Sequence, residues 1–109
     1  MAIILSTQDK ISTVGNAGDI ERITLEMLGG GTAVVYEDNI PKCVELIRGN
    51  QVRGIITPWG HGEETTVWNL EKYLGPLQIP VFEAYKLGRS GWSGKEYRTW
   101  LSQNLLQNQ

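Results

Sequence analysis

The stretch that decides the fold is Gly54-Ile55-Ile56-Thr57-Pro58-Trp59-Gly60-His61-Gly62-Glu63-Glu64-Thr65-Thr66. The apolar run that ends at Thr57 predicts a buried strand, because short continuous apolar runs are typical of strands covered on both faces. The glycines after it predict a loop, and either Thr65 or Thr66 is expected to begin a helix. The segment also holds the chain's only histidine, one of its four tryptophans and a pair of acids. We therefore treat it as the structural and the chemical centre of the sequence.

The same succession of strand, loop and helix recurs four times along the chain. Apolar runs predict the strands Ala2–Leu5, Thr32–Tyr36, Val52–Thr57 and Ile79–Tyr85. Pro80 should lie near the start of the last strand, since proline has no N–H to donate to a sheet. Strands that alternate with helices form parallel sheets covered on both faces. The sequence thus predicts a three-layer α/β/α fold with a four-stranded parallel sheet, flavodoxin-like or Rossmann-like, in one domain over residues 1–109.

Capping residues and glycines bound the expected helices. Asn16 or Gly18 can cap the first helix, and Asn39 can cap the second. The fourth helix should follow a capping box, Ser93-Gly94-Lys95-Glu96, and the last five residues are expected to fray. The first three helices should end at Gly29-Gly30-Gly31, at Gly49-Asn50 and at Gly75-Pro76. Cys43 lies on the apolar face of the second helix, which indicates a small buried hydrophobe and not a nucleophile.

The order of the strands determines where a ligand would bind. Right-handed crossovers leave 2-1-3-4 as the expected order and 3-2-1-4 as the alternative. In the first order the topology switches between strands 1 and 3, and open α/β sheets bind ligands at such a switch, at the carboxyl ends of the strands. The Ser6–Gly18 loop and the Pro58–Glu64 loop should therefore meet at one edge, joined in some arrangements by the Lys86–Ser93 loop.

Composition excludes several classes of protein. Hydrophobic residues make up 40% and charged residues 20% of the chain, which is typical of a globular domain. The net charge of -2 argues against binding of long nucleic acids, which favours basic domains. We expect no membrane span and no signal peptide, because no apolar run is long enough. A single cysteine cannot form an internal disulfide, so a cytoplasmic location is expected.

The glycine loop in the opening stretch is the main candidate binding site. Gly60 and Gly62 permit close approach of a ligand to the backbone, and a loop before a helix can present free N–H groups to an anion such as phosphate. Glu63 and Glu64 oppose this, because two carboxylates at a helix N-terminus would repel an anion. They could instead contact ribose hydroxyls or act as a base. The alternative is a plain turn between strand and helix with acidic capping residues.

The sequence from the third strand through Pro58-Trp59-Gly60-His61-Gly62, followed by Ile79-Pro80-Val81, resembles a known family. It is similar to the P-G-G-x-G-T loop of the lysine-decarboxylase-like nucleotide phosphoribohydrolases and their nucleotide-sensing relatives. The resemblance covers about 30 residues and implies a Rossmann-like fold whose loop holds a nucleotide phosphate. Trp59 replaces the first glycine of the motif and Glu63 its threonine, and the family's downstream catalytic glutamate has no clear counterpart. The resemblance therefore supports a nucleotide-like ligand more than a hydrolase activity.

Acid–base chemistry would depend on His61, Glu63 and Glu64. The unperturbed pKa of histidine lies near neutrality, which suits a general acid or base, although a lone histidine on a glycine loop is more often a bystander or a ligand contact. No metal is expected, because there is no second histidine and the three residues are too close in sequence to form a standard site. Asp9 and Asp19 could add carboxylates for a loosely held magnesium ion only. We expect no cofactor.

Further candidates for ligand binding lie in the other loops. Ser6, Thr7, Gln8 and Asn16 belong to the first loop, and Arg89 and Ser90 to the loop before the last helix, where arginine could bind phosphate. Trp59 and Trp92 are placed in loops, where a tryptophan can stack on a base, seal an interface or plug the core.

Three functions are compatible with these observations. The first is the binding of a nucleotide or related phosphorylated small molecule at the carboxyl edge of the sheet, by a homodimer or other homo-oligomer, since small α/β domains often complete a site across a two-fold axis. The second is an enzyme that cleaves a glycosidic or phosphodiester bond of a nucleotide. The third is an adaptor that binds protein through its loop tryptophans.

Overall fold

The computed structural model describes residues 2–7, 17–57, 63–83 and 94–106 of the chain. Within these ranges the strands are β1 (Ala2–Ser6), β2 (Thr32–Tyr36), β3 (Val52–Thr57) and β4 (Val81–Glu83). The helices are α1 (Ala17–Leu28), α2 (Ile40–Arg48), α3 (Glu63–Leu74), α4 (Gly94–Leu101) and the π-helical turn η2 (Ser102–Leu106). The expected alternation of strands and helices is confirmed.

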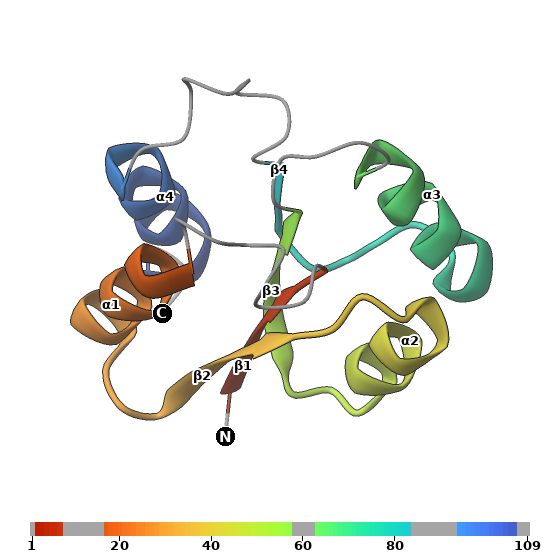
Figure 1. Ribbon diagram of the computed structural model, residues 1–109, viewed down its shortest axis with the longest axis horizontal. Coiled ribbons are helices and arrows are strands. Elements are labelled where there is room, and N and C mark those ends of the chain that lie inside the picture. Colours follow the sequence, from red (N-terminus) through yellow and green to blue (C-terminus); the bar gives the residue numbers. More distant parts are fainter. Residues whose placement is uncertain (1, 8–16, 58–62, 84–93, 107–109) are drawn as a thin grey trace.

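The four strands form one parallel sheet in the order β2-β1-β3-β4. This is the 2-1-3-4 order expected from the sequence, so the 3-2-1-4 alternative is wrong. The helices α1 and α4 cover one face of the sheet and α2 and α3 cover the other (Figure 1). The three-layer α/β/α architecture is therefore confirmed. The topology switches between β1 and β3, because the chain continues from β1 outward to β2 and from β3 outward to β4 on the other side.

Local signals account for most of the helix boundaries. The side chain of Asn39 caps α2 by accepting a hydrogen bond of 3.1 Å from the Lys42 amide. Gly29 and Gly75 follow α1 and α3 with positive φ angles of 79° and 74°, a conformation that other residues rarely adopt. Gly18 lies inside α1 and is not its cap. Asn16 and Ser93, the other expected capping residues, lie outside the described residues.

Several details differ from those expected. The helix α3 begins at Glu63, two residues before Thr65, and β1 ends at Ser6, one residue after Leu5. The strand β4 begins at Val81 and not at Ile79, and Pro80 contributes only its carbonyl, which accepts from the Ile55 amide at 3.0 Å. The expected fraying at Leu105 is wrong, since Leu105 is buried in η2.

Two hydrophobic layers separate the helices from the sheet. The layer under α1 and α4 contains Ile4, Ile20, Ile23, Ile56, Phe82, Tyr97, Leu101 and Leu105. The layer under α2 and α3 contains Leu5, Cys43, Val44, Val52, Ile55 and Leu70. Adjacent residues of β1 and β3 thus enter opposite layers, which explains the consecutive apolar residues Ile4-Leu5 and Ile55-Ile56. Cys43 is a free, buried thiol, as its place on the apolar face of the helix predicted.

Gly54 lets a side chain of α4 come close to the backbone of β3. A Cβ atom placed on Gly54 would lie 2.8 Å from Cη2 of Trp100 and 3.3 Å from Cδ1 of Ile4. Trp100 also packs against Phe82 and Tyr97, with ring centroids 5.6 Å and 6.0 Å away. These two aromatic neighbours therefore oppose a shift of the indole away from a larger residue at position 54.

We expect Gly54→Ala to lower the free energy of unfolding by about 1–3 kcal/mol, the usual cost of overpacking a core. Urea denaturation monitored by tryptophan fluorescence would measure the change. Gly30→Ala is the control, because a Cβ at Gly30 has no atom within 4 Å. Equal stability of Gly54→Ala and the wild-type chain would contradict the close packing of Trp100.

A buried hydroxyl pair joins α1 to α4. The Oγ1 atom of Thr24 lies 2.7 Å from the Tyr97 hydroxyl and donates to the Ile20 carbonyl at 2.6 Å. Burial raises the pKa of Tyr97 to about 12, although the Thr24 hydrogen bond acts in the opposite direction. The folded state therefore favours the neutral phenol more strongly than the unfolded state does.

This pKa shift predicts a loss of stability in alkali. Tyr97 makes its full contribution to the free energy of unfolding below about pH 10, where its side chain is still neutral in the unfolded chain. This contribution is lost as the pH rises towards about 12. We expect urea titrations between pH 8 and pH 11.5 to show stability falling by up to about 1.4 kcal/mol per pH unit above pH 10 from this group. Tyr97→Phe should flatten that decline. The same slope in both proteins would show that Tyr97 ionises freely in the fold.

Candidate functional site

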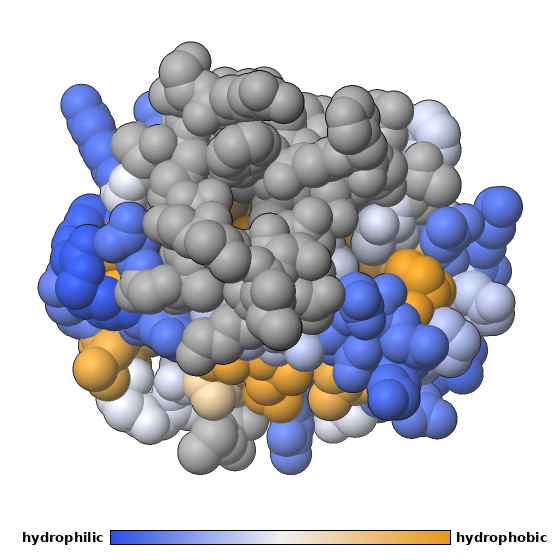
Figure 2. All heavy atoms as spheres, in the orientation of Figure 1, coloured by the Kyte–Doolittle hydropathy of each residue, from blue (hydrophilic) through white to orange (hydrophobic). Residues whose placement is uncertain are grey.

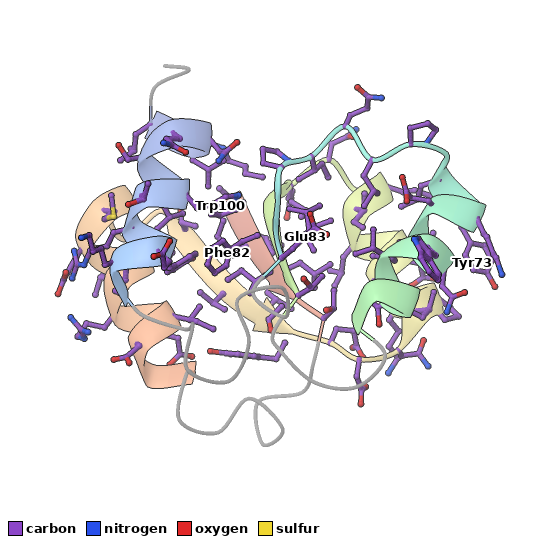
Figure 3. The ribbon with its side chains drawn as sticks, turned by 90° about the horizontal axis from the view of Figure 1, so that it is seen from above. Tyr73, Phe82, Glu83 and Trp100 are labelled. Atoms are coloured by element: carbon purple, nitrogen blue, oxygen red, sulfur yellow. The ribbon has the colours of Figure 1, made fainter. Side chains whose placement is uncertain are left out.

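The carboxyl edge of the sheet brings the ends of three strands together. Ser6 of β1 pairs with Ile56 of β3, and Thr57 of β3 pairs with Glu83 of β4. The helices α1, α3 and α4 each come after one of these strands in the chain and run back along the parallel sheet. Figure 3 looks down on the molecule from above and shows Glu83 between the two helical layers, with Phe82 and Trp100 towards α4. This edge, between β1 and β3, is the candidate site.

Threonine hydroxyls tie the strand ends to one another. Thr7 donates its amide to the Ile56 carbonyl at 3.1 Å, and its Oγ1 atom reaches the same carbonyl at 3.4 Å. Thr57 donates its hydroxyl to the Phe82 carbonyl at 3.3 Å. Both threonines are buried. Their hydroxyls therefore satisfy backbone carbonyls where the strands end, and they hold the edge in a defined shape.

Ser6 differs from these two threonines. Its side chain is fully buried, yet its Oγ atom has no hydrogen-bond partner among the described residues. A buried hydroxyl without a partner costs about 1–3 kcal/mol, so native proteins rarely keep one without a reason. Within the described part of this edge, the Ser6 hydroxyl therefore has hydrogen-bonding capacity to offer a ligand.

The alternation of side chains along β1 defines the surroundings of Ser6. Ile4 packs in the layer under α1 and α4, so Ser6, two residues later, faces the same side. Its partner in β2 is Tyr36, whose hydroxyl interacts with Glu21 of α1. Burial, followed by the charge of Glu21, raises the pKa of Tyr36 far above its ordinary value. Tyr36 is therefore a neutral hydrogen-bonding group throughout the physiological pH range.

The structure brings only some of the sequence-predicted site residues to this edge. Ser6 and Thr7 end β1, and Glu63 and Glu64 are the first two residues of α3. The remaining candidates lie outside the described residues: Gln8, Asn16, Pro58, Trp59, Gly60, His61, Gly62, Arg89, Ser90 and Trp92.

Three residues at this edge were not singled out from the sequence. Thr57 and Glu83 end β3 and β4, and Tyr36 ends β2. A polar residue at the end of an apolar strand could have indicated a site residue, and for Thr57 this pattern was visible in the sequence. The contact between Tyr36 and Glu21 has no comparable signal, because it depends on how α1 lies across the sheet.

The described residues supply neither a cluster of metal ligands nor a membrane-spanning helix. No group of three or more histidine, cysteine, aspartate or glutamate side chains gathers in this part of the chain. Among the same residues, no helix is both long enough and apolar enough to cross a membrane. The polar groups described at this edge are hydroxyls and carboxylates, which suit hydrogen bonding to a small polar ligand.

Comparisons with known proteins do not add a family to this description. No family model matches the chain, and neither a curated protein nor a solved structure is significantly similar to it.

The contrast between Ser6 and Thr57 predicts opposite effects on stability. Ser6→Ala removes a buried hydroxyl without a partner and should raise the free energy of unfolding by about 1 kcal/mol. Thr57→Val breaks the bond to the Phe82 carbonyl and should lower it by about 1–2 kcal/mol. Urea unfolding of the two variants beside the wild type would measure both. A destabilised Ser6→Ala would mean that the hydroxyl is satisfied in the folded protein.

Proposed function

We propose that the chain binds a nucleotide or a related phosphorylated small molecule at the carboxyl edge of the sheet, between β1 and β3. The observation that carries the proposal is the buried Ser6 hydroxyl without a partner at the end of β1. A ligand that accepts a hydrogen bond from this hydroxyl recovers the cost of burying it. Phosphate oxygens are suitable acceptors.

The position of Ser6 supports the same conclusion. It ends one of the two strands that flank the switch point, where open α/β sheets bind their ligands. The helix α3 follows β3, and its first N–H groups have no partner within the helix. Carboxylates in the first turn of a helix repel anions, so Glu63 and Glu64 would suit contacts with sugar hydroxyls better than contacts with phosphate.

A homodimer in the cytoplasm is part of the proposal. The chain has one cysteine, and that thiol is buried, as suits a protein made and kept in a reducing compartment. Small α/β domains commonly form two-fold symmetric dimers.

A thermal-shift screen against nucleotides, dinucleotides, cyclic nucleotides and inorganic phosphate tests the ligand class. A ligand present at a hundred times its dissociation constant stabilises the folded state by about 2.7 kcal/mol. For a chain of this size the melting temperature should then rise by roughly 10 °C. If none of the phosphorylated compounds shifts the melting temperature while a protein partner does, the chain is an adaptor. Turnover of a stabilising compound, abolished in His61→Ala, would identify an enzyme.

The Ser6→Ala variant tests the site. A hydrogen bond to a charged group contributes about 1.5–3 kcal/mol, so the affinity for the phosphorylated ligand should fall roughly tenfold to a hundredfold. Isothermal titration calorimetry would measure the affinity. Ser102→Ala is the matched control, because it removes the same hydroxyl from η2, which lies at the far end of α4. If the Ser6→Ala and wild-type chains bind the ligand with equal affinity, Ser6 is not part of the binding site.

A further inference from the structure

The outer edge of β2 is open among the described residues. β2 is the last strand of the sheet and pairs only with β1. The Gly31 carbonyl accepts from the Ala2 amide at 3.1 Å, and the Glu37 amide donates to the Ser6 carbonyl at 3.0 Å. Successive residues of a strand direct their peptide groups to alternate sides. Between Gly31 and Glu37, the peptide groups that point away from β1 are therefore those of Thr32, Val34 and Tyr36.

The two edges of the sheet are built differently. β4 begins directly after Pro80 and contains the charged Glu83. Proline and charge are among the usual means of preventing a strand edge from pairing with another chain. β2, with the sequence Thr-Ala-Val-Val-Tyr, contains neither a charged residue nor a proline. Of the two edges, β2 is the one built to accept another strand.

The two faces of the sheet differ beside the β2 edge: an exposed apolar side chain lies on one, and a cavity with apolar and charged residues lies on the other. On α1, Glu21 interacts with Tyr36, and Leu25 follows one helical turn later with 60% of its surface exposed. On the other face, a cavity of about 430 Å³ is lined by Val35, Glu37, Lys42, Glu45 and Leu46. Figure 2 shows hydrophobic side chains across the lower part of this side of the molecule, where Figure 1 shows β2.

We propose that a second copy of the chain binds at this edge, with the two β2 strands antiparallel about a two-fold axis through Val34, so that the two sheets become one. Val34 then lies opposite Val34 of the second copy, and Thr32 lies opposite Tyr36. Pairs of β-branched and aromatic residues are favourable across antiparallel strands.

Charge explains why the partner is a second copy. A two-fold axis brings every residue near it close to its own equivalent, so a charged strand would repel itself, and β2 carries no charge. The cavity beside the strand has both signs, Lys42 with Glu37 and Glu45, and each copy can therefore meet its opposite charge. The helix α1 packs against β2, so the pairing would bring the two α1 helices towards each other on one face of the joined sheet.

This inference gives the proposed homodimer a surface, but it needs no ligand and stands or falls separately from the nucleotide site.

Sedimentation equilibrium over a range of concentrations tests the pairing. The wild-type chain should dimerise. Thr32→Pro removes an outward N–H at the first position of the strand, where an edge tolerates proline, and Leu25→Lys adds a charge beside the axis. Each should raise the dimer dissociation constant tenfold or more. Trp68→Lys is the matched control, because Trp68 is also 60% exposed but lies on α3, and it should leave the constant unchanged.

Circular dichroism would show whether the variants are folded. If Thr32→Pro does not fold, the dissociation constant of Leu25→Lys alone tests the pairing of the two β2 strands. A wild-type chain that stays monomeric at all concentrations would overturn the inference. So would a dimer that Trp68→Lys dissociates and Leu25→Lys does not. If the Leu25→Lys variant is monomeric and binds the phosphorylated ligand with normal affinity, ligand binding does not depend on the dimer. The nucleotide site and the dimer edge can then be judged separately.

Discussion

Burial of β1 and β3 on both faces is the constraint on which the rest of the structure depends. Ile4 and Ile56 enter one hydrophobic layer and Leu5 and Ile55 the other, so helices must cover each face. On the α4 side this is possible only because Gly54 lets Trp100 approach the backbone of β3. The crossovers that place helices on both faces also bring the carboxyl ends of β1 and β3 side by side. The candidate site is therefore a consequence of how the core is covered.

Most of the fold could be predicted because the signals are local. The apolar runs predicted β2 and β3 with their observed bounds, and Asn39 was recognised as the cap of α2. The errors occurred where tertiary packing outweighs local preference. Leu105 is held in the core by its neighbours, although a polar chain end favours fraying. β4 begins later than its apolar run because Pro80 cannot take part as a donor in the hydrogen-bonding pattern.

The candidate site was only partly predictable. The rule for parallel sheets indicated the correct edge, and with it Ser6 and Thr7. It did not distinguish Ser6 from Thr57, since both are hydroxyl residues that end an apolar strand. The difference arises from pairing in three dimensions, which gives Thr57 the Phe82 carbonyl as a partner and Ser6 none among the described residues. The role of the central glycine loop stays a prediction, because residues 58–62 lie outside the described ranges.

The unpartnered hydroxyl of Ser6 is a departure from what stability alone favours, and departures of this kind are expected at functional positions. Ser6 also lies beside the β2 edge, since it pairs with Tyr36. Antiparallel pairing through Val34 would nevertheless point the two carboxyl edges in opposite directions, because the strands of the two copies run against each other. Neither copy would then complete the site of the other. Each chain would bind its own ligand, and the dimer would join two independent sites through one continuous sheet.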